Sequence, residues 1–268
     1  MTGFRQLELL VKSIPMVTRV QLRIIVLFLA GALPIGCHAD QPSIAEILKK
    51  VSDTYQNLQS YEFVAERITE TAAVGSIEPA QGGRVQSNFH KSSTSEIVLA
   101  IVNPKEFRPD VKEEGGGLLL VSDGQTKWTY LPKRKQYTEE SAAGSTESDE
   151  LRSYRALLVD RFRGLSQYSS SAVLEKDNQL KIGGAKIACY VIKIQTQHGV
   201  FELWVDKDRY IVWKSKHVGP AASEGISFQE TVTVNLSQAR VNTDIEESLF
   251  QFTPPEKAAK VTSMDSKK

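Results

Sequence analysis

The 268-residue sequence has almost no excess charge, only two cysteines and no apolar run as long as a membrane-spanning helix. Lys and Arg number 33 against 32 Asp and Glu, which gives a formal net charge of +1. That balance does not indicate nucleic acid as a partner, because nucleic-acid binding depends on clustered positive charge. Residues 24–36 form an apolar stretch, but it is shorter than the ~20 residues that span a bilayer. Two cysteines do not build a disulfide framework.

Motifs of nucleotide binding and of catalysis are missing as well. The sequence contains no P-loop, no nucleotide-binding glycine fingerprint and no nucleophile elbow. His90, His198 and His217 are scattered, and none is spaced from a Cys or a carboxylate as metal ligands are. We therefore expect ordinary surface or turn histidines, no cofactor, no metal site and no enzymatic activity.

The N-terminal segment has the pattern of a secretory signal. Arg19 and Arg23 precede the apolar stretch 24–36, and small residues follow it. We predict that residues 1–39 are a signal peptide and that the mature protein is periplasmic. The long segment before Met16 is unusual for a signal, and we hypothesise that translation begins at Met16.

The cleavage site has two interpretations. Cleavage after Ala39 would release a diffusing protein. Alternatively, residues 33–37 are a lipobox, in which case Cys37 is lipidated and anchors the protein to the outer membrane. Pro34 stands where Leu is usual in a lipobox, and this favours ordinary cleavage slightly. Cys189 lies in an apolar stretch, which predicts that it is a small buried side chain.

Two helices are predicted in the folded region, residues 40–262, which precedes a disordered tail at 263–268. Residues 43–58 repeat apolar side chains at i, i+3 and i+4, which indicates an amphipathic helix. Residues 150–165 repeat apolar side chains at the same spacing and lie between two segments that we expect to be mobile. This second helix is either a lid or a permanently packed crossover helix.

Strands account for most of the remaining chain. The strongest signal is residues 118–137, where Asp123-Gly124 separates two β-rich runs, as in a tight hairpin. Residues 91–94 are predicted to form a turn, and the prolines at 104 and 109 indicate an edge or corner of the sheet. Further strands are predicted at 61–66, 84–90, 95–102, 171–175, 179–182, 186–195, 200–205, 211–217 and 226–236. Short strands with regular turns and few helices indicate a mainly β (α+β) protein with one antiparallel sheet curled into a barrel or half-barrel.

Three separated stretches resemble the periplasmic outer-membrane lipoprotein carriers, the LolA-like superfamily, with its lipoprotein receptor (LolB-like) and periplasmic stress-sensor (RseB-like) relatives. The first is NPKEFR (103–108) followed by LVSDG (120–124) and Trp128, Tyr130 and Pro132. The second is FELWVD (201–206) running into IVWK (211–214), and the third is FQFTPP (250–255). Their order and spacing span roughly residues 44–262.

This resemblance implies a half-open antiparallel β-barrel in which an N-terminal helix and a lid helix cover an apolar cavity that binds acyl chains. Alternation along the predicted strands and the lid helix selects the side chains that we expect to line this cavity. They are Leu99, Ile101, Phe107, Leu120, Trp128, Tyr130, Leu157, Leu158, Phe162, Tyr190, Ile192, Trp204, Trp213 and Phe228.

The first hypothesis is a monomeric periplasmic carrier of acyl lipid or lipoprotein that exchanges cargo with a membrane-anchored donor or acceptor protein. The alternative is a membrane-anchored sensor or scaffold that binds a protein partner and regulates envelope stress signalling.

One departure from the family concerns the carrier hypothesis. The carriers have an Arg before the Pro of the first motif that helps to hold the lid shut, and Asn103 stands there in this chain. Arg108 or arginines of the lid helix are candidate substitutes.

Overall fold

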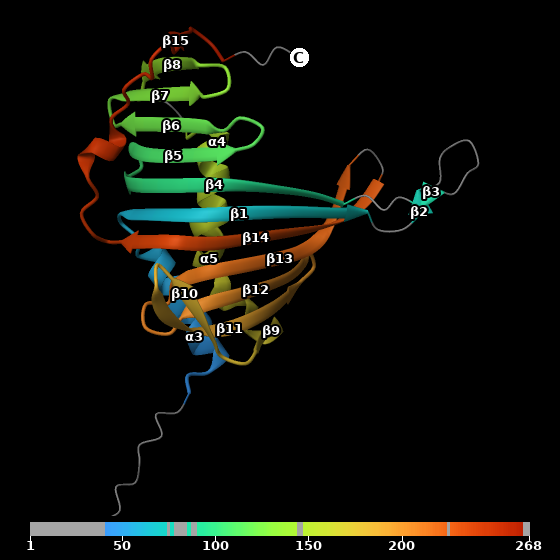
Figure 1. Ribbon diagram of the computed structural model, residues 1–268. Helices are drawn as coiled ribbons and strands as arrows, with labels where there is room; N and C mark the ends of the chain where they lie inside the picture. The colour runs from blue at the N-terminus through green and yellow to red at the C-terminus, as the bar shows by residue number, and fades with distance from the viewer. Residues whose placement is uncertain are drawn as a thin grey trace, which may run out of the picture. The chain divides into compact units, whose positions relative to one another are not determined.

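The computed structural model describes residues 41–73, 76–77, 85–86, 90–143, 147–223 and 226–264 (Figure 1). Met16, Cys37 and the rest of the predicted signal lie outside the described residues, as do residues 265–268. Pro42–Lys268 form one compact unit, described here by itself.

The unit begins with a helix and then consists mainly of strands. The helical elements are α3 (Ile44–Gln56), α4 (Asp149–Arg155), the π-helical turn η1 (Ala156–Asp160), α5 (Arg161–Arg163), and the 3-10 helices η2 (Leu165–Ser171) and η3 (Glu247–Phe250). The first strands are β1 (Tyr61–Ala73), β2 (Ser76–Ile77), β3 (Val85–Gln86), β4 (His90–Asn103), β5 (Glu106–Glu113), β6 (Leu118–Asp123), β7 (Thr126–Leu131) and β8 (Gln136–Ser141). The later strands are β9 (Ala172–Leu174), β10 (Asn178–Ile182), β11 (Ala185–Thr196), β12 (Gly199–Asp206), β13 (Val212–Ser223), β14 (Ile226–Val241) and β15 (Ala259–Lys260).

Within the described residues, 13 strands form one sheet in the order β10-β11-β12-β13-β14-β1-β4-β5-β6-β7-β8-β15, with β9 also paired to β11. Among the described strands, every pairing in this sheet is antiparallel except that of β15 with β8. The mainly β, antiparallel prediction is therefore confirmed. The sheet does not close into a barrel, because its order ends at β10 on one side and at β15 on the other.

Helix α3 forms where its sequence predicts. Ser43 caps it, since the Ser43 hydroxyl accepts the Glu46 N–H while the Glu46 carboxylate accepts the Ser43 N–H in a capping box. Its apolar stripe is fully buried through Ile47, Leu48, Val51 and Tyr55. The helix therefore packs into the core, as predicted.

The second predicted helix is also present and runs continuously through α4, η1 and α5, followed by η2. We call residues 149–171 the helical cover. Ser148 caps it at Leu151, and Leu157, Leu158, Val159 and Phe162 are buried. Figure 1 shows α4 and α5 behind the middle strands of the sheet. Both α3 and the cover contribute to the same apolar core as the sheet.

The hairpin at 118–137 is confirmed. Ser122 pairs with Lys127 across the turn between β6 and β7. Gly124 has φ +87°, a conformation that favours glycine, and the Asp123 carboxylate accepts the N–H groups of Gln125 and Thr126.

The predicted turn at residues 91–94 is wrong. These residues continue β4 and pair with β1, from Thr71 opposite Lys91 to Ile68 opposite Thr94. Polar residues suit this strand, because residues 90–94 are exposed. Pro104 lies in the turn between β4 and β5, as predicted, but the prediction of an edge or corner is wrong for Pro109. Pro109 lies inside β5, between β4 and β6, and the pairing with β6 lapses at residues 108–109, where proline has no N–H to donate.

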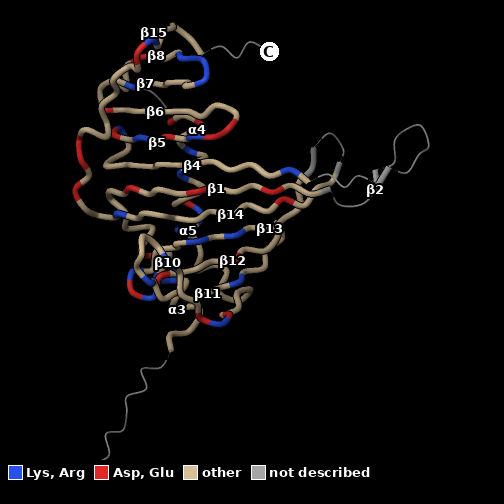
Figure 2. Tube along the Cα trace, in the orientation of Figure 1, with Lys and Arg blue, Asp and Glu red and all other residues tan. Residues whose placement is uncertain are grey.

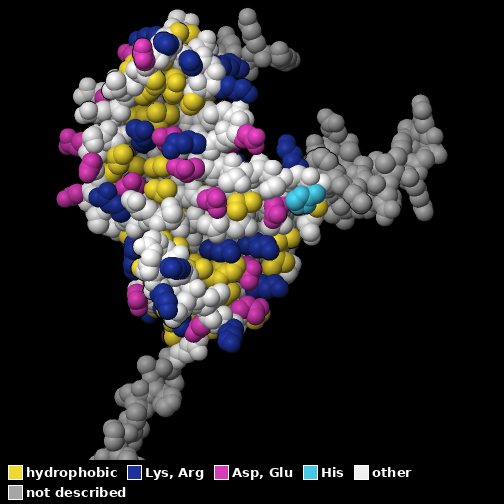
Figure 3. All heavy atoms as spheres, in the orientation of Figure 1, with side chains coloured by type: hydrophobic (Ala, Val, Ile, Leu, Met, Phe, Trp, Pro, Cys, Tyr) yellow, Lys and Arg dark blue, Asp and Glu magenta, His cyan; other side chains and the backbone are white. Residues whose placement is uncertain are grey.

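The face of the sheet away from the helices carries the C-terminal segment. Ile245 and Phe250 pack with Ala100 there. Phe252 contacts the rings of Trp128 and Tyr130 at centroid distances of 6.1 and 6.0 Å. Charges of both signs are interspersed along the chain (Figure 2), and the face shown in Figure 3 mixes them with apolar side chains.

Candidate functional site

The candidate site lies between the helical cover and the sheet. Alternation along each strand places one set of side chains against α3 and the cover, and we call this side of the sheet the inner face. Phe63, Leu99 and Leu203 belong to it and are fully or almost fully buried. Farther along the same strands, the inner face stops being filled by core side chains.

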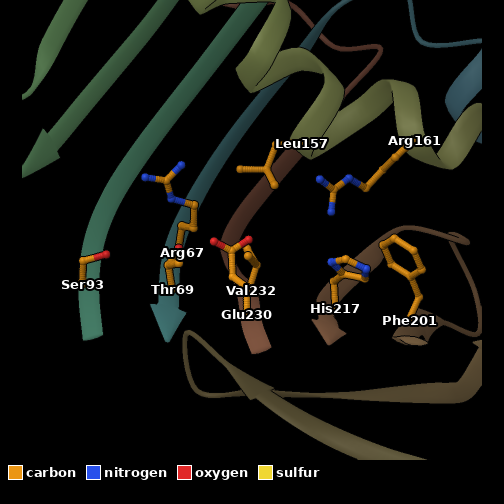
Figure 4. A pocket seen from close by; sticks show the side chains of 9 residues that line it. All are labelled: Arg67, Thr69, Ser93, Leu157, Arg161, Phe201, His217, Glu230 and Val232. Carbon is orange, nitrogen blue, oxygen red and sulfur yellow. The ribbon is translucent and has the colours of Figure 1, made fainter. Parts of the chain in front are cut away.

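Two adjoining pockets open there. The polar pocket, about 530 Å³, is lined by Arg67, Thr69, Ser93, Leu157, Arg161, Phe201, His217, Glu230 and Val232 (Figure 4). The apolar pocket, about 260 Å³, is lined by Asp160, Arg161, Phe162, Gly164, Leu165, Gln167, Tyr168, Ile194, Thr196, Phe201 and Leu203. Both linings include Arg161 and Phe201, so the two pockets adjoin at these side chains, and we call them together the groove, with an apolar end and a charged end.

Arg161 carries the charge between the two pockets. Its Nε donates to the Ala156 carbonyl oxygen at 3.2 Å. Within the described part of the chain, its terminal nitrogens have no hydrogen-bond acceptor and no carboxylate within 4 Å. Burial lowers the pKa of Arg161 to about 10, so the side chain is still a cation at neutral pH.

Three further ionisable groups face the polar pocket. The guanidinium of Arg67 lies 4.0 Å from the Glu113 carboxylate, and Glu230 contributes one carboxylate to the lining. The His217 ring stacks on Phe201 with centroids 4.2 Å apart, and its Nε2 lies 3.1 Å from the His198 carbonyl oxygen. A carbonyl oxygen only accepts, so Nε2 carries a proton and Nδ1 is the other hydrogen-bonding atom of the ring.

Most predicted cavity residues from the central strands lie on the inner face but inside the packed core. Leu99, Ile101, Phe107, Leu120 and Ile192 are buried there with α3 and the cover, although Ile101 and Phe107 also line a separate pocket of about 290 Å³ and Leu120 one of about 380 Å³. From the cover, Leu157 lines the polar pocket and Phe162 the apolar pocket, whereas Leu158 is buried in the core.

Three predicted aromatic residues lie elsewhere. Leu120 pairs with Thr129, so Trp128 and Tyr130 lie on the opposite face, against Phe252. Trp204 alternates with the inner-face residue Leu203 and therefore also faces outward. Adjacent strand residues point to opposite faces, so a prediction that is off by one position inverts the side chain.

The other predicted aromatic residues lie away from the groove. The Trp213 Nε1 donates to the Asp206 carboxylate at 3.0 Å, and the amine of Lys207 lies 4.6 Å from the centre of the Tyr190 ring. Phe228 shares a side of β14 with Glu230 and Val232 but is not part of either pocket lining.

Apart from Leu157 and Phe162, the lining residues of the two pockets were not predicted, among them Arg67, Arg161, Phe201, His217 and Glu230. Arg161 had one usable signal, since it lies four residues after Leu157 and therefore borders the apolar stripe of the helix. His217 looked like an ordinary turn histidine, and only the pairing of β12 with β13 places it opposite Phe201.

Within the described residues, no hydrogen bond joins Asn103 to the helical cover. Asn103 instead caps the turn between β4 and β5, where its side-chain oxygen accepts the N–H groups of Lys105 and Glu106. Arg108 cannot substitute for the carriers' Arg at the cover, because it binds the Leu249 carbonyl oxygen on the other face.

Hydrogen bonds to α3 hold the cover in place. The Arg163 Nε donates to the Tyr55 carbonyl oxygen at 3.3 Å, and the Gln56 amide donates to the Arg163 carbonyl oxygen at 2.8 Å. The Ser166 N–H donates to the Ser52 hydroxyl at 2.9 Å. An arginine of the cover, Arg163, thus helps to hold the cover against α3.

No group of three His, Cys, Asp or Glu side chains that could hold a metal ion occurs among the described residues. No helix in the same part of the chain combines the length and apolar character needed to cross a bilayer. Cys189 is buried, as predicted, and burial raises its thiol pKa to about 11.

Comparison with known sequences finds a family model that matches part of the chain. Residues 173–263 match the family model "Predicted periplasmic protein (DUF2092)", in agreement with the periplasmic location predicted from the signal. The chain is 25% identical over 244 residues to "Uncharacterized protein MJ0687" of Methanocaldococcus jannaschii. That alignment covers 90% of this chain, and the chain spans 60% of the relative's length.

The chain is also similar, at low sequence identity, to several solved structures. The MucA/MucB complex of Pseudomonas aeruginosa contains a chain with 14% identity and a TM-score of 0.37, covering 78% of this chain and 61% of that one. A putative outer membrane lipoprotein-sorting protein domain from Vibrio parahaemolyticus has 15% identity and a TM-score of 0.28, with coverages of 77% and 95%. A LolA superfamily protein from Nitrosomonas europaea has 12% identity and a TM-score of 0.27, with coverages of 79% and 99%.

Proposed function

We propose that this protein is a periplasmic carrier that binds the acyl chains of a lipid or lipoprotein in the groove between the helical cover and the inner face. The observation that carries this proposal is the apolar pocket. This space of about 260 Å³ adjoins the larger polar pocket, and its apolar lining comes from Phe162, Leu165, Ile194, Phe201 and Leu203.

The driving force is burial of methylene groups. Each buried methylene contributes about 0.8 kcal/mol, so a chain that places a few methylenes in the groove gains several kcal/mol. The half-buried residues at the junction of the pockets leave that surface accessible without unfolding of the core. The groove contains no group of residues arranged for a covalent step, so the proposed role is binding and transfer.

The experiment is mass spectrometry of protein purified from its native envelope without detergent, combined with uptake of a fluorescent fatty acid by delipidated protein. We expect co-purifying acyl lipid and saturable uptake. Phe201→Asp, which places a carboxylate between the two pockets, should abolish uptake. Val173→Asp is the matched control, because Val173 is 59% exposed and lies outside both pockets. An empty protein without uptake would contradict the proposal and favour a partner-binding sensor.

A further inference from the structure

Arg161 is the feature of the groove that acyl-chain binding does not explain. A hydrophobic groove gains nothing from a half-buried cation, since burial disfavours the charged form. Other cations of the cover are neutralised: Arg155 bonds Glu147 and Asp160 at 2.7 and 2.8 Å, and Arg163 lies 3.3 Å from Asp160. Arg161 has no such partner among the described residues.

The surroundings of Arg161 fit an oxyanion. Figure 4 shows Arg161 extending from the helix toward His217 across the polar pocket. The Nδ1 atom of His217 is not used in its bond to the His198 carbonyl oxygen, so a protonated ring can donate there to a bound anion. Arg67 adds a second guanidinium to the lining. The lining holds two arginines and one carboxylate, that of Glu230, and Glu113 lies 4.0 Å from Arg67, so Arg161 is the guanidinium without a carboxylate partner among the described residues.

We propose that the groove selects anionic amphiphiles: Arg161, with His217 opposite, binds a carboxylate or phosphate headgroup while the acyl chain enters the adjoining apolar pocket. This inference rests on the proposed function. It adds a specificity that the apolar pocket cannot supply, because methylene burial does not distinguish an anionic headgroup from a neutral one. The guanidinium suits this role, since its planar N–H donors match carboxylate and phosphate oxygens.

The test compares ligands of equal chain length by isothermal titration calorimetry with the delipidated protein. The ligands are dodecanoate, dodecyl phosphate and the neutral monododecanoyl glycerol, with inorganic phosphate alone as a fourth. We expect both anionic amphiphiles to bind at least about tenfold more tightly than the neutral one, a ratio equivalent to 1.4 kcal/mol. Inorganic phosphate alone should bind far more weakly than dodecyl phosphate.

Charge variants identify the residues. Arg161→Gln should remove the preference for anions, measured as the ratio of the affinities for the anionic and the neutral amphiphiles. Glu230→Gln should strengthen binding of the anions, and it keeps the proposal testable if Arg161→Gln does not fold. Arg152→Gln is the matched control on the same helix, because Arg152 is exposed and bonds Asp149 at 3.0 Å. This control should leave the affinities of all four ligands unchanged.

The outcomes separate the two proposals. Equal affinity for neutral and anionic amphiphiles, unaffected by Arg161→Gln, would overturn the headgroup site and leave acyl binding standing. Binding of inorganic phosphate as tight as that of dodecyl phosphate would overturn the assignment to amphiphiles. No binding of any amphiphile would overturn both the headgroup site and the proposed carrier function.

Discussion

Truncation of Phe162 tests whether the helical cover is part of the cooperative core or a loosely attached lid. The ring is 4% exposed, and its centroid lies 4.9 Å from that of Tyr55 on α3. Replacing a buried Phe by Ala typically costs about 3–5 kcal/mol, and an aromatic pair adds about 0.5–1.5 kcal/mol to burial alone. Since Phe162 also lines the apolar pocket, part of the new space joins an existing one. We therefore expect Phe162→Ala to cost about 3 kcal/mol, the lower end of this range.

The assay is urea unfolding followed by tryptophan fluorescence, with hydrogen exchange resolved by peptide. A cover that belongs to the core should give one transition with a lower midpoint and faster exchange in both the cover and the sheet. Val173→Ala is the control, because Val173 is an exposed apolar residue, and it should cost less than about 1 kcal/mol.

One result would refute the reasoning. If Phe162→Ala left the unfolding midpoint unchanged and exchange rose only in residues 149–171, the cover would be an independent lid. The two interpretations of the second helix left open by the sequence would then be resolved in favour of a gate rather than a packed crossover helix.

Three further predictions concern side chains that packing shields from solvent. Tyr55→Phe should lower the free energy of unfolding by about 1–3 kcal/mol, because the Tyr55 hydroxyl accepts the buried Val212 N–H at 3.1 Å; urea denaturation with a loss below about 0.5 kcal/mol would contradict this. Cys189 should resist iodoacetamide at pH 8 in the native state, since its pKa of about 11 leaves the thiol protonated; site-resolved mass spectrometry showing labelling as fast as in urea would disprove protection. Phe252→Ala should shift tryptophan emission to longer wavelength by exposing Trp128, and an unchanged spectrum would show that Phe252 does not shield it.

Local sequence patterns predicted most of the secondary structure. The capped stripe of α3 and the Asp123-Gly124 turn depend on interactions within a few residues, so they can be inferred without knowledge of the rest of the chain. The strands after residue 171 are likewise confirmed, because alternation and turn residues are local signals. The error at residues 91–94 has the opposite cause: those polar residues are held in β4 by pairing with residues 68–71 of β1, which lie 20 to 26 positions earlier in the chain.

The sequence by itself determined a mainly β protein with a covering helix and apolar side chains for a core. Only the tertiary structure decided which of these side chains fill the core and which border a groove. Trp128 and Trp204 show why, since a strand's two faces differ by one residue and the register depends on distant partners. The charged end of the groove depends on tertiary structure even more strongly. Arg161, His217 and Arg67 come from a helix and two strands, and their proximity follows from the packing of those elements rather than from any spacing along the chain.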